Sequence, residues 1–132
     1  MKLTEVIEDI SKEERYYKCG FCDAFALALN KKFGYPLYII RGYWYDKEEE
    51  EWVSEAAHAI VKSGKKYIDV SGFKSKEYLI NNSFFNNPIE KVKIEPISIE
   101  EMKYSFTTEG VSEEEIKKAI KFIEKNIERY RG

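Results

Sequence analysis

One uninterrupted apolar run constrains this sequence more than any other feature. Residues 24–29 read AFALAL, six apolar residues in succession, and at 3.6 residues per turn such a run covers every side of a helix. Gly34 and Pro36 follow the run and supply a stop signal. We therefore predict a buried helix over residues 23–33, central to the domain and enclosed by the rest of the chain.

Three segments with the composition of β-strands follow this helix. They are residues 37–45 (LYIIRGYWY), 52–62 (WVSEAAHAIVK) and 66–72 (KYIDVSG), rich in the β-branched and aromatic residues that strands favour. The acidic connector KEEEE at 47–51 joins the first two, and we interpret it as a solvated loop tip. Ser63 and Gly64 supply a short turn before the third. The three segments are predicted to pair in antiparallel order.

Shorter signals place further elements around this core. An N-terminal helix is predicted from apolar residues at helical spacing, namely Leu3, Val6, Ile7 and Ile10. A helical turn at 75–80, a loop at 81–87 and an edge strand ended by Pro96 come next. Ser112 with Glu115 forms a capping box before a last helix, whose apolar stripe comprises Ile116, Ala119, Ile120, Ile123, Ile127 and Tyr130. The predicted fold class is α+β: a buried central helix packed on an antiparallel sheet, with flanking N- and C-terminal helices.

Length and charge limit the classes of protein to which the chain can belong. With 132 residues, 43% of them hydrophobic, we expect a single domain over 1–132. A net charge of −2 gives no electrostatic reason to expect a nucleic acid or an anionic membrane as partner. The N-terminus carries acids and lacks the apolar run of a signal peptide or membrane span, so we expect a cytoplasmic protein. Two cysteines three positions apart do not form a disulfide framework.

Cys22 is the candidate nucleophile. It lies where a loop containing Gly20 enters the predicted buried helix, so its sulfur is expected near the unpaired N–H groups and positive dipole end of that helix. That position favours the thiolate, and a neighbouring imidazolium would favour it further. His58 is the only histidine in the chain, and it is therefore the candidate base.

The predicted hairpin supplies a third member for this group. A two-residue turn at Ser63 and Gly64 would pair Lys62 with Lys65, and continuing that register places His58 directly opposite Asp69. Opposed residues share one face of a sheet, so their side chains can meet. Asp69 would then orient the imidazole while the other ring nitrogen points at Cys22, as a Cys-His-Asp triad requires.

The order of these residues resembles the core of transglutaminase-like proteins in the papain-like superfamily. The resemblance covers residues 20–72, about two fifths of the chain. It comprises a Gly-x-Cys at the helix start, an alanine-rich helix, a Gly-x-Pro, a Gly-Tyr, a His-Ala and an Asp on successive strands. Here these are Gly20 and Cys22, Gly34 and Pro36, Gly42 and Tyr43, His58 and Ala59, and Asp69. The resemblance implies a papain/transglutaminase-like fold with Cys22, His58 and Asp69 as catalytic residues.

The residues around the nucleophile are also similar to the CGSC motif of papain-type proteases, since residues 19–22 read CGFC. The chain departs from the family patterns at Ile60, where an aromatic residue often follows His-Ala, and at Asp23, where papain has Trp. Tyr16 stands at the position of papain's oxyanion-hole Gln. The Cys22 backbone N–H and the Tyr16 side chain are therefore the candidate oxyanion donors.

Such a site is predicted to attack a carbonyl, form a thioester on Cys22 and transfer the acyl group to water or an amine. Hydrolysis is favoured over crosslinking, because so small a domain offers little sequence for an acyl-acceptor site. The expected substrates are proteins, peptides or small amides. Neither a cofactor nor a metal is expected.

Three other functions are compatible with parts of the sequence. Cys19 and Cys22 suit a thiol-disulfide oxidoreductase, although the charged ERYYK segment before them is unlike the buried strand that precedes such motifs. A zinc site would have Cys19, Cys22 and His58, whereas a structural zinc takes four ligands. The chain could also be a non-catalytic binding protein, for example a host-directed or anti-defence factor, that retains the fold.

Overall fold

The computed structural model describes residues 12, 15–17 and 20–131. The predicted N-terminal helix and Cys19 lie outside these residues. The elements of the described part are, in order, α2 (Cys22–Phe33), β1 (Leu37–Asp46), β2 (Glu51–Ser63), β3 (Lys66–Asp69), β4 (Gly72–Lys74), α3 (Lys76–Asn81), β5 (Lys91–Pro96), α4 (Ile99–Tyr104), α5 (Glu113–Lys125) and α6 (Ile127–Tyr130). No helix among the described residues is both long and apolar enough to cross a bilayer.

Helix α2 has the buried character that its apolar run predicts. All residues from 22 to 29 are buried. Gly34 ends the helix in the left-handed conformation, with φ of 76°, and its N–H donates to the carbonyl of Asn30. Glycine adopts this conformation without the steric penalty that a Cβ imposes, which explains why the helix stops there.

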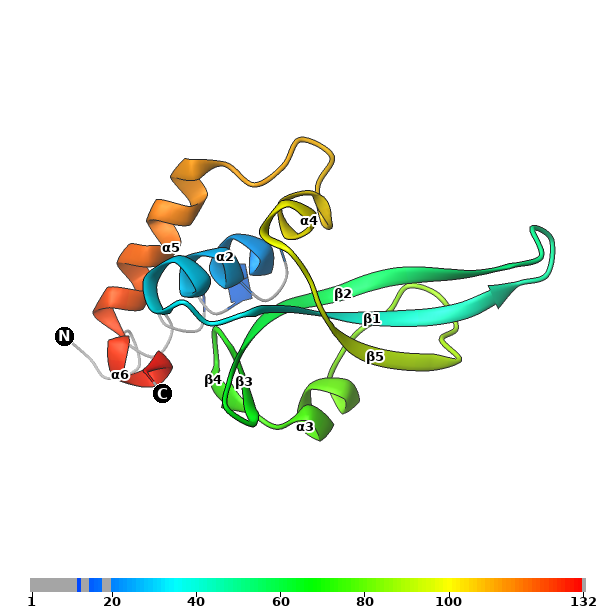
Figure 1. The fold of residues 1–132 in the computed structure, drawn as a ribbon, viewed down its shortest axis with the longest axis horizontal. Helices are drawn as coiled ribbons and strands as arrows, with labels where there is room; N and C mark the ends of the chain where they lie inside the picture. The colour runs from blue at the N-terminus through cyan, green and yellow to red at the C-terminus, as the bar shows by residue number, and fades with distance from the viewer. Residues whose placement is uncertain (1–11, 13–14, 18–19, 132) are drawn as a thin grey trace.

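The strands form one antiparallel sheet in the order β4-β3-β2-β1-β5. The predicted pairing of the first three strands is confirmed, and β5 with Pro96 at its end lies at an edge of the sheet. Figure 1 shows β1 and β2 as a long hairpin that extends away from the helices. Residues 47–50 form its exposed turn, as expected for a charged loop tip.

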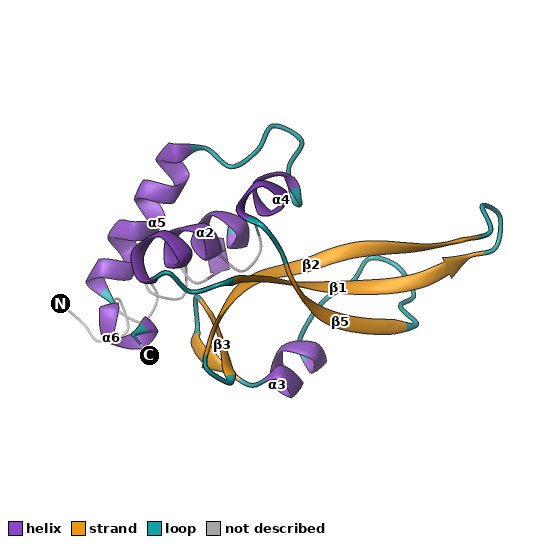
Figure 2. Ribbon diagram, in the orientation of Figure 1, coloured by secondary structure: helices purple, strands orange, loops and turns teal. Residues whose placement is uncertain are grey.

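The sheet separates two layers of helices. Figure 2 shows α2, α4 and α5 on one side of it and α3 on the other. On the α2 side, Ala59, Val61 and Ile68 join the main core. On the α3 side, Ile40, Ile60 and Leu79 belong to a second, smaller core. Because successive strand residues point to opposite faces, the apolar residues 59–61 contribute side chains to both cores. The fold is α+β, in agreement with the sequence.

Two features of the fold differ from the prediction or were missed by it. The last helix is interrupted at Asn126, whose side chain donates to the carbonyl of Phe122 and whose backbone leaves the helical region. The apolar stripe continues across this break into α6, and therefore does not reveal it. Strand β4 was not predicted, because three residues are too few to establish a period. Helix α4 was missed although Ser98 and Glu101 form a capping box at its start. The Ser112 cap is confirmed by the Glu115 N–H donated to its side chain.

Candidate active site

Helix α2 carries Cys22 at its first position. The preceding residue, Phe21, has no side chain that can cap the helix. The first N–H groups of a helix have no partner within it, so Cys22 lies at the end of α2 where donors and the positive dipole gather. Cys22 is a free thiol and is 7% exposed. It is therefore mostly shielded from solvent at the helix end where the sequence placed it.

His58 and Asp69 meet across β2 and β3. The Nε2 atom of His58 lies 3.3 Å from Oδ2 of Asp69, and their side chains are 14% and 6% exposed. The second carboxylate oxygen of Asp69 accepts the N–H of Ser71 at 2.8 Å. The Oδ1 atom thus holds the carboxylate to the backbone of the turn after β3, while Oδ2 faces the imidazole. Because Nε2 faces Asp69, Nδ1 is the ring nitrogen left for Cys22.

The hairpin that brings this pair together has a different turn from the predicted one. Ser63 pairs with Lys66, so the turn consists of Gly64 and Lys65. Gly64 has φ of 62°, as the first position of a type II′ turn requires, and glycine adopts that angle more readily than serine. The predicted turn at Ser63 and Gly64 was therefore wrong by one residue.

This correction moves Asp69 relative to His58 but leaves both on one face. Val61 pairs with Ile68, and continuing the register sets Asp69 opposite Ile60 and diagonal to His58. A shift of the turn by one residue changes the pairing by two positions, and side chains alternate with a period of two. Diagonal neighbours on one face are within reach of long side chains. The predicted contact thus forms, although the predicted direct opposition was wrong.

A β-bulge lies immediately before His58. Ile40 of β1 pairs with His58, whereas the next residue, Arg41, pairs with Ala56. Ala57 is consequently an extra residue in β2. Bulges of this kind locally twist a strand and re-aim its side chains, and they are frequent beside active sites. The sequence gives no direct signal for this bulge.

The pKa of His58 is raised from 6.5 to about 9. Burial acts in the opposite direction, because desolvation disfavours the charged ring. Hydrogen bonding to Asp69 and to Cys22, together with the electrostatic interaction of each with the ring, outweighs that burial. His58 is therefore an imidazolium at neutral pH, with Asp69 and Cys22 both acting on it.

Asp23 is a buried acid that the sequence analysis treated only as a departure from a family pattern. It is 4% exposed, and Oδ1 accepts the N–H of Ala24 at 2.8 Å. Burial raises the pKa of its carboxyl, hydrogen bonds to backbone N–H groups lower it, and the charge of Glu115 raises it further. Asp23 thus accepts one of the first N–H groups of α2, that of Ala24, whereas Phe21 before the helix has no side chain that could do so. Its place between Cys22 and the apolar run at 24–29 was the signal for it.

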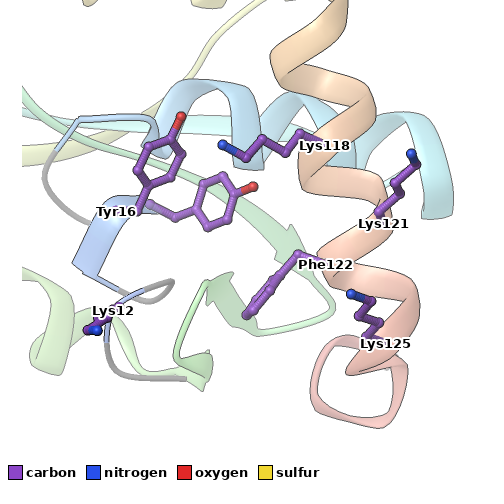
Figure 3. Close-up of a pocket in the computed structure, with 7 residues that line it drawn as sticks. Lys12, Tyr16, Lys118, Lys121, Phe122 and Lys125 are labelled. Carbon is purple, nitrogen blue, oxygen red and sulfur yellow. The ribbon is translucent and has the colours of Figure 1, made fainter. Parts of the chain in front are cut away.

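Tyr16, the predicted oxyanion donor, makes its hydrogen bond elsewhere. Its hydroxyl donates to Glu115 of α5 at 2.9 Å, and its ring stacks on Phe21 at 4.3 Å between centroids. Burial and then Glu115 raise the pKa of the phenol to about 12. Figure 3 shows Tyr16 in a pocket beside Lys118, Lys121 and Lys125, and no triad residue lines that pocket. The oxyanion role of Tyr16 stays a prediction, and the bond to Glu115 weighs against it.

Comparison of the chain with protein-family models, curated protein sequences and solved structures found no match. The case for a function therefore depends on the chain's own residues. Cys22, His58 and Asp69 lie together in the structure. The redox and zinc alternatives both need Cys19, which is outside the described residues, and they stay predictions.

Proposed function

We propose that this chain is a cysteine-dependent acyl-transfer enzyme that hydrolyses an amide or peptide bond through a thioester on Cys22. His58 is the acid and base, and Asp69 orients it. The α+β fold, with a cysteine at the start of a buried helix followed by antiparallel strands bearing His and then Asp, supports a papain/transglutaminase-like core. The observation that carries the proposal is that Asp69 and Cys22 both act on one buried imidazole.

The first half-reaction makes the thioester. The Cys22 thiolate attacks the carbonyl carbon, an S–C bond forms, and the carbonyl π electrons move to oxygen. The Cys22 backbone N–H, at the start of α2, is the proposed donor to that oxygen. When the carbonyl re-forms, the C–N bond breaks, and the imidazolium of His58 gives its proton to the leaving amine. A protonated His58 at neutral pH suits this step.

The second half-reaction releases the acyl group. The imidazole of His58, now neutral, takes a proton from water as the water oxygen attacks the thioester carbon. The C–S bond then breaks, the carboxylic acid leaves, and the thiolate and imidazolium are restored. Asp69 keeps Nε2 engaged throughout, which holds the ring with Nδ1 toward the sulfur.

The proposal is tested by the pH dependence of alkylation at Cys22. Iodoacetamide is applied from pH 5 to 9 to the wild type and to His58→Ala, Cys19→Ser and Cys22→Ser, and each cysteine is followed by peptide mass spectrometry. We expect Cys22 to react rapidly below neutral pH, where free cysteine is mostly protonated. His58→Ala should abolish this reactivity at low pH, whereas Cys19→Ser should retain it.

Two outcomes would contradict the proposal. Slow reaction of Cys22 at acidic pH, rising near pH 8.5 like an ordinary thiol, would favour a non-catalytic binding protein. Fast reaction at Cys19 that depends on Cys22 would favour redox chemistry. Cys22→Ser serves as the control that assigns the signal to its cysteine.

A further inference from the structure

A pocket of about 580 Å³ opens beside the His58 and Asp69 pair. The two catalytic side chains form part of its lining. Helix α3 and the residues after it supply the rest, including Tyr78, Ser83 and Phe84. Cys22 does not line this pocket. The pocket therefore adjoins the imidazole and Asp69 without including the attacking sulfur in its lining.

The side chains of this pocket favour an apolar occupant. Apart from the catalytic pair, its lining has neither an acid, a lysine nor an arginine. Tyr78 is 44% exposed and Phe84 is 93% exposed. A single exposed aromatic residue is common on a protein surface, but two that border a pocket shared with a catalytic pair form an apolar contact surface. Lys74 is not among the lining residues, but its Nζ lies 4.7 Å from the centroid of the Tyr78 ring.

Local hydrogen bonds support the segment that presents these aromatic side chains. Leu79 is buried in the smaller core and anchors α3 to the sheet. The Ser83 hydroxyl donates to the Leu79 carbonyl at 2.5 Å, and the Asn82 side chain donates to the Tyr78 carbonyl at 2.8 Å. These bonds fix the chain just before Phe84. Phe84 thus stands on a supported turn although its own side chain is exposed.

The roles of Cys22 and His58 determine which half of a substrate lies beside this pocket. The acyl carbon must reach the sulfur of Cys22, whereas the leaving amine must reach the proton on His58. The amine side of the scissile bond consequently extends over the imidazole. Substituents on that side continue toward the pocket that His58 and Asp69 share with α3.

We propose that this pocket binds the amine-side group of an amide or peptide substrate, and that it favours an apolar or aromatic substituent there. This inference rests on the proposed function. Tyr78 and Phe84 provide the contact surface for that substituent.

The test uses alkylating probes that differ only on the amine side. Iodoacetamide, N-(2-phenylethyl)iodoacetamide and N-(2-carboxyethyl)iodoacetamide each transfer a CH₂–C(O)–NH–R group to the Cys22 sulfur as iodide leaves. Second-order rate constants at Cys22 are divided by those for glutathione with the same probe, which removes intrinsic reactivity. We expect the phenylethyl probe to exceed iodoacetamide by roughly tenfold in this normalised rate, as partial burial of one aromatic ring allows.

Variants connect the preference to the pocket. Phe84→Ala should reduce the phenylethyl-to-iodoacetamide ratio several-fold, and Phe84→Lys should shift the preference toward the carboxyethyl probe. Trp52→Ala is the matched control, because Trp52 is an aromatic residue of β2 that is 52% exposed and does not line the pocket. Its ratio should equal that of the wild type.

The outcomes separate this inference from the proposed function. If iodoacetamide itself reacts at acidic pH no faster than with glutathione, the triad proposal fails and the inference fails with it. If iodoacetamide reacts rapidly but all three probes give equal normalised rates, the triad stands and the pocket assignment is overturned. A phenylethyl preference that survives both Phe84 variants would also overturn it.

Discussion

Replacing Asp69 by Asn should lower the pKa of His58 substantially. Asn retains an oxygen that can accept a hydrogen bond from Nε2 of His58, but it removes the negative charge now 3.3 Å from that nitrogen. The burial that disfavours the imidazolium is unchanged by the substitution. The remaining support comes from Cys22 alone, so the balance that holds the pKa near 9 is shifted toward the neutral ring.

The size of the effect follows from the geometry. An opposite charge within about 4–6 Å shifts a pKa by about 1–3 units, and each unit corresponds to about 1.4 kcal/mol. We therefore expect the pKa of His58 to fall from about 9 to between about 6 and 8. The wild-type ring should stay charged through neutral pH and lose its proton only as the pH rises through about 9. In the variant it should lose its proton within the neutral range.

The measurement is an NMR titration of the imidazole nitrogens. His58 is the only histidine in the chain, so its ring signals need no further assignment. Asp46→Asn is the matched control, since Asp46 caps the β1–β2 turn through the N–H groups of Glu48 and Glu49 and makes no contact with His58. The double variant Asp69→Asn with Cys22→Ser measures how strongly the two partners are coupled through the ring.

Two results would refute this reasoning. A wild-type His58 that titrates near 6.5 would mean that Asp69 and Cys22 do not outweigh its burial. A high pKa that persists in Asp69→Asn would mean that Cys22 alone sustains the imidazolium, and Asp69 would lose its assigned role in the triad.

Two further predictions test the frame that holds the site. Gly64→Ala should destabilise the fold by about 1 kcal/mol, because φ of 62° is unfavourable for a residue with a Cβ. The control, Lys65→Ala, should change stability little. Equal effects of the two substitutions in urea denaturation would contradict the revised turn. Gly42→Ala should destabilise by about 1–3 kcal/mol, because the new Cβ would approach the ring of Phe85 to 2.6 Å, and an unchanged denaturation midpoint would show that this contact relaxes freely.

Much of the fold follows from local sequence signals. The apolar run before Gly34 predicts both the burial and the end of α2, because a helix that is apolar on all sides must be enclosed. Strand composition predicts β1, β2 and β3, and the Ser112 cap marks the start of α5. Strand β4 is too short for such signals, whereas α4 has a Ser98 cap with Glu101 that the sequence analysis missed. Both form where the packed sheet and α2 offer them partners.

The sequence by itself proposed the members of the candidate site, because it holds one histidine, one cysteine at the start of an apolar helix and one acid on β3, the strand that pairs with that of His58. Only the tertiary structure decided how they meet. The turn begins at Gly64, Ala57 is an extra residue before His58, and Asp69 approaches the ring diagonally. Tyr16 bonds to Glu115 and Asp23 is buried at the helix start. The physical reason is that alternation fixes the face of each side chain locally, whereas register, bulges and burial depend on contacts between distant segments.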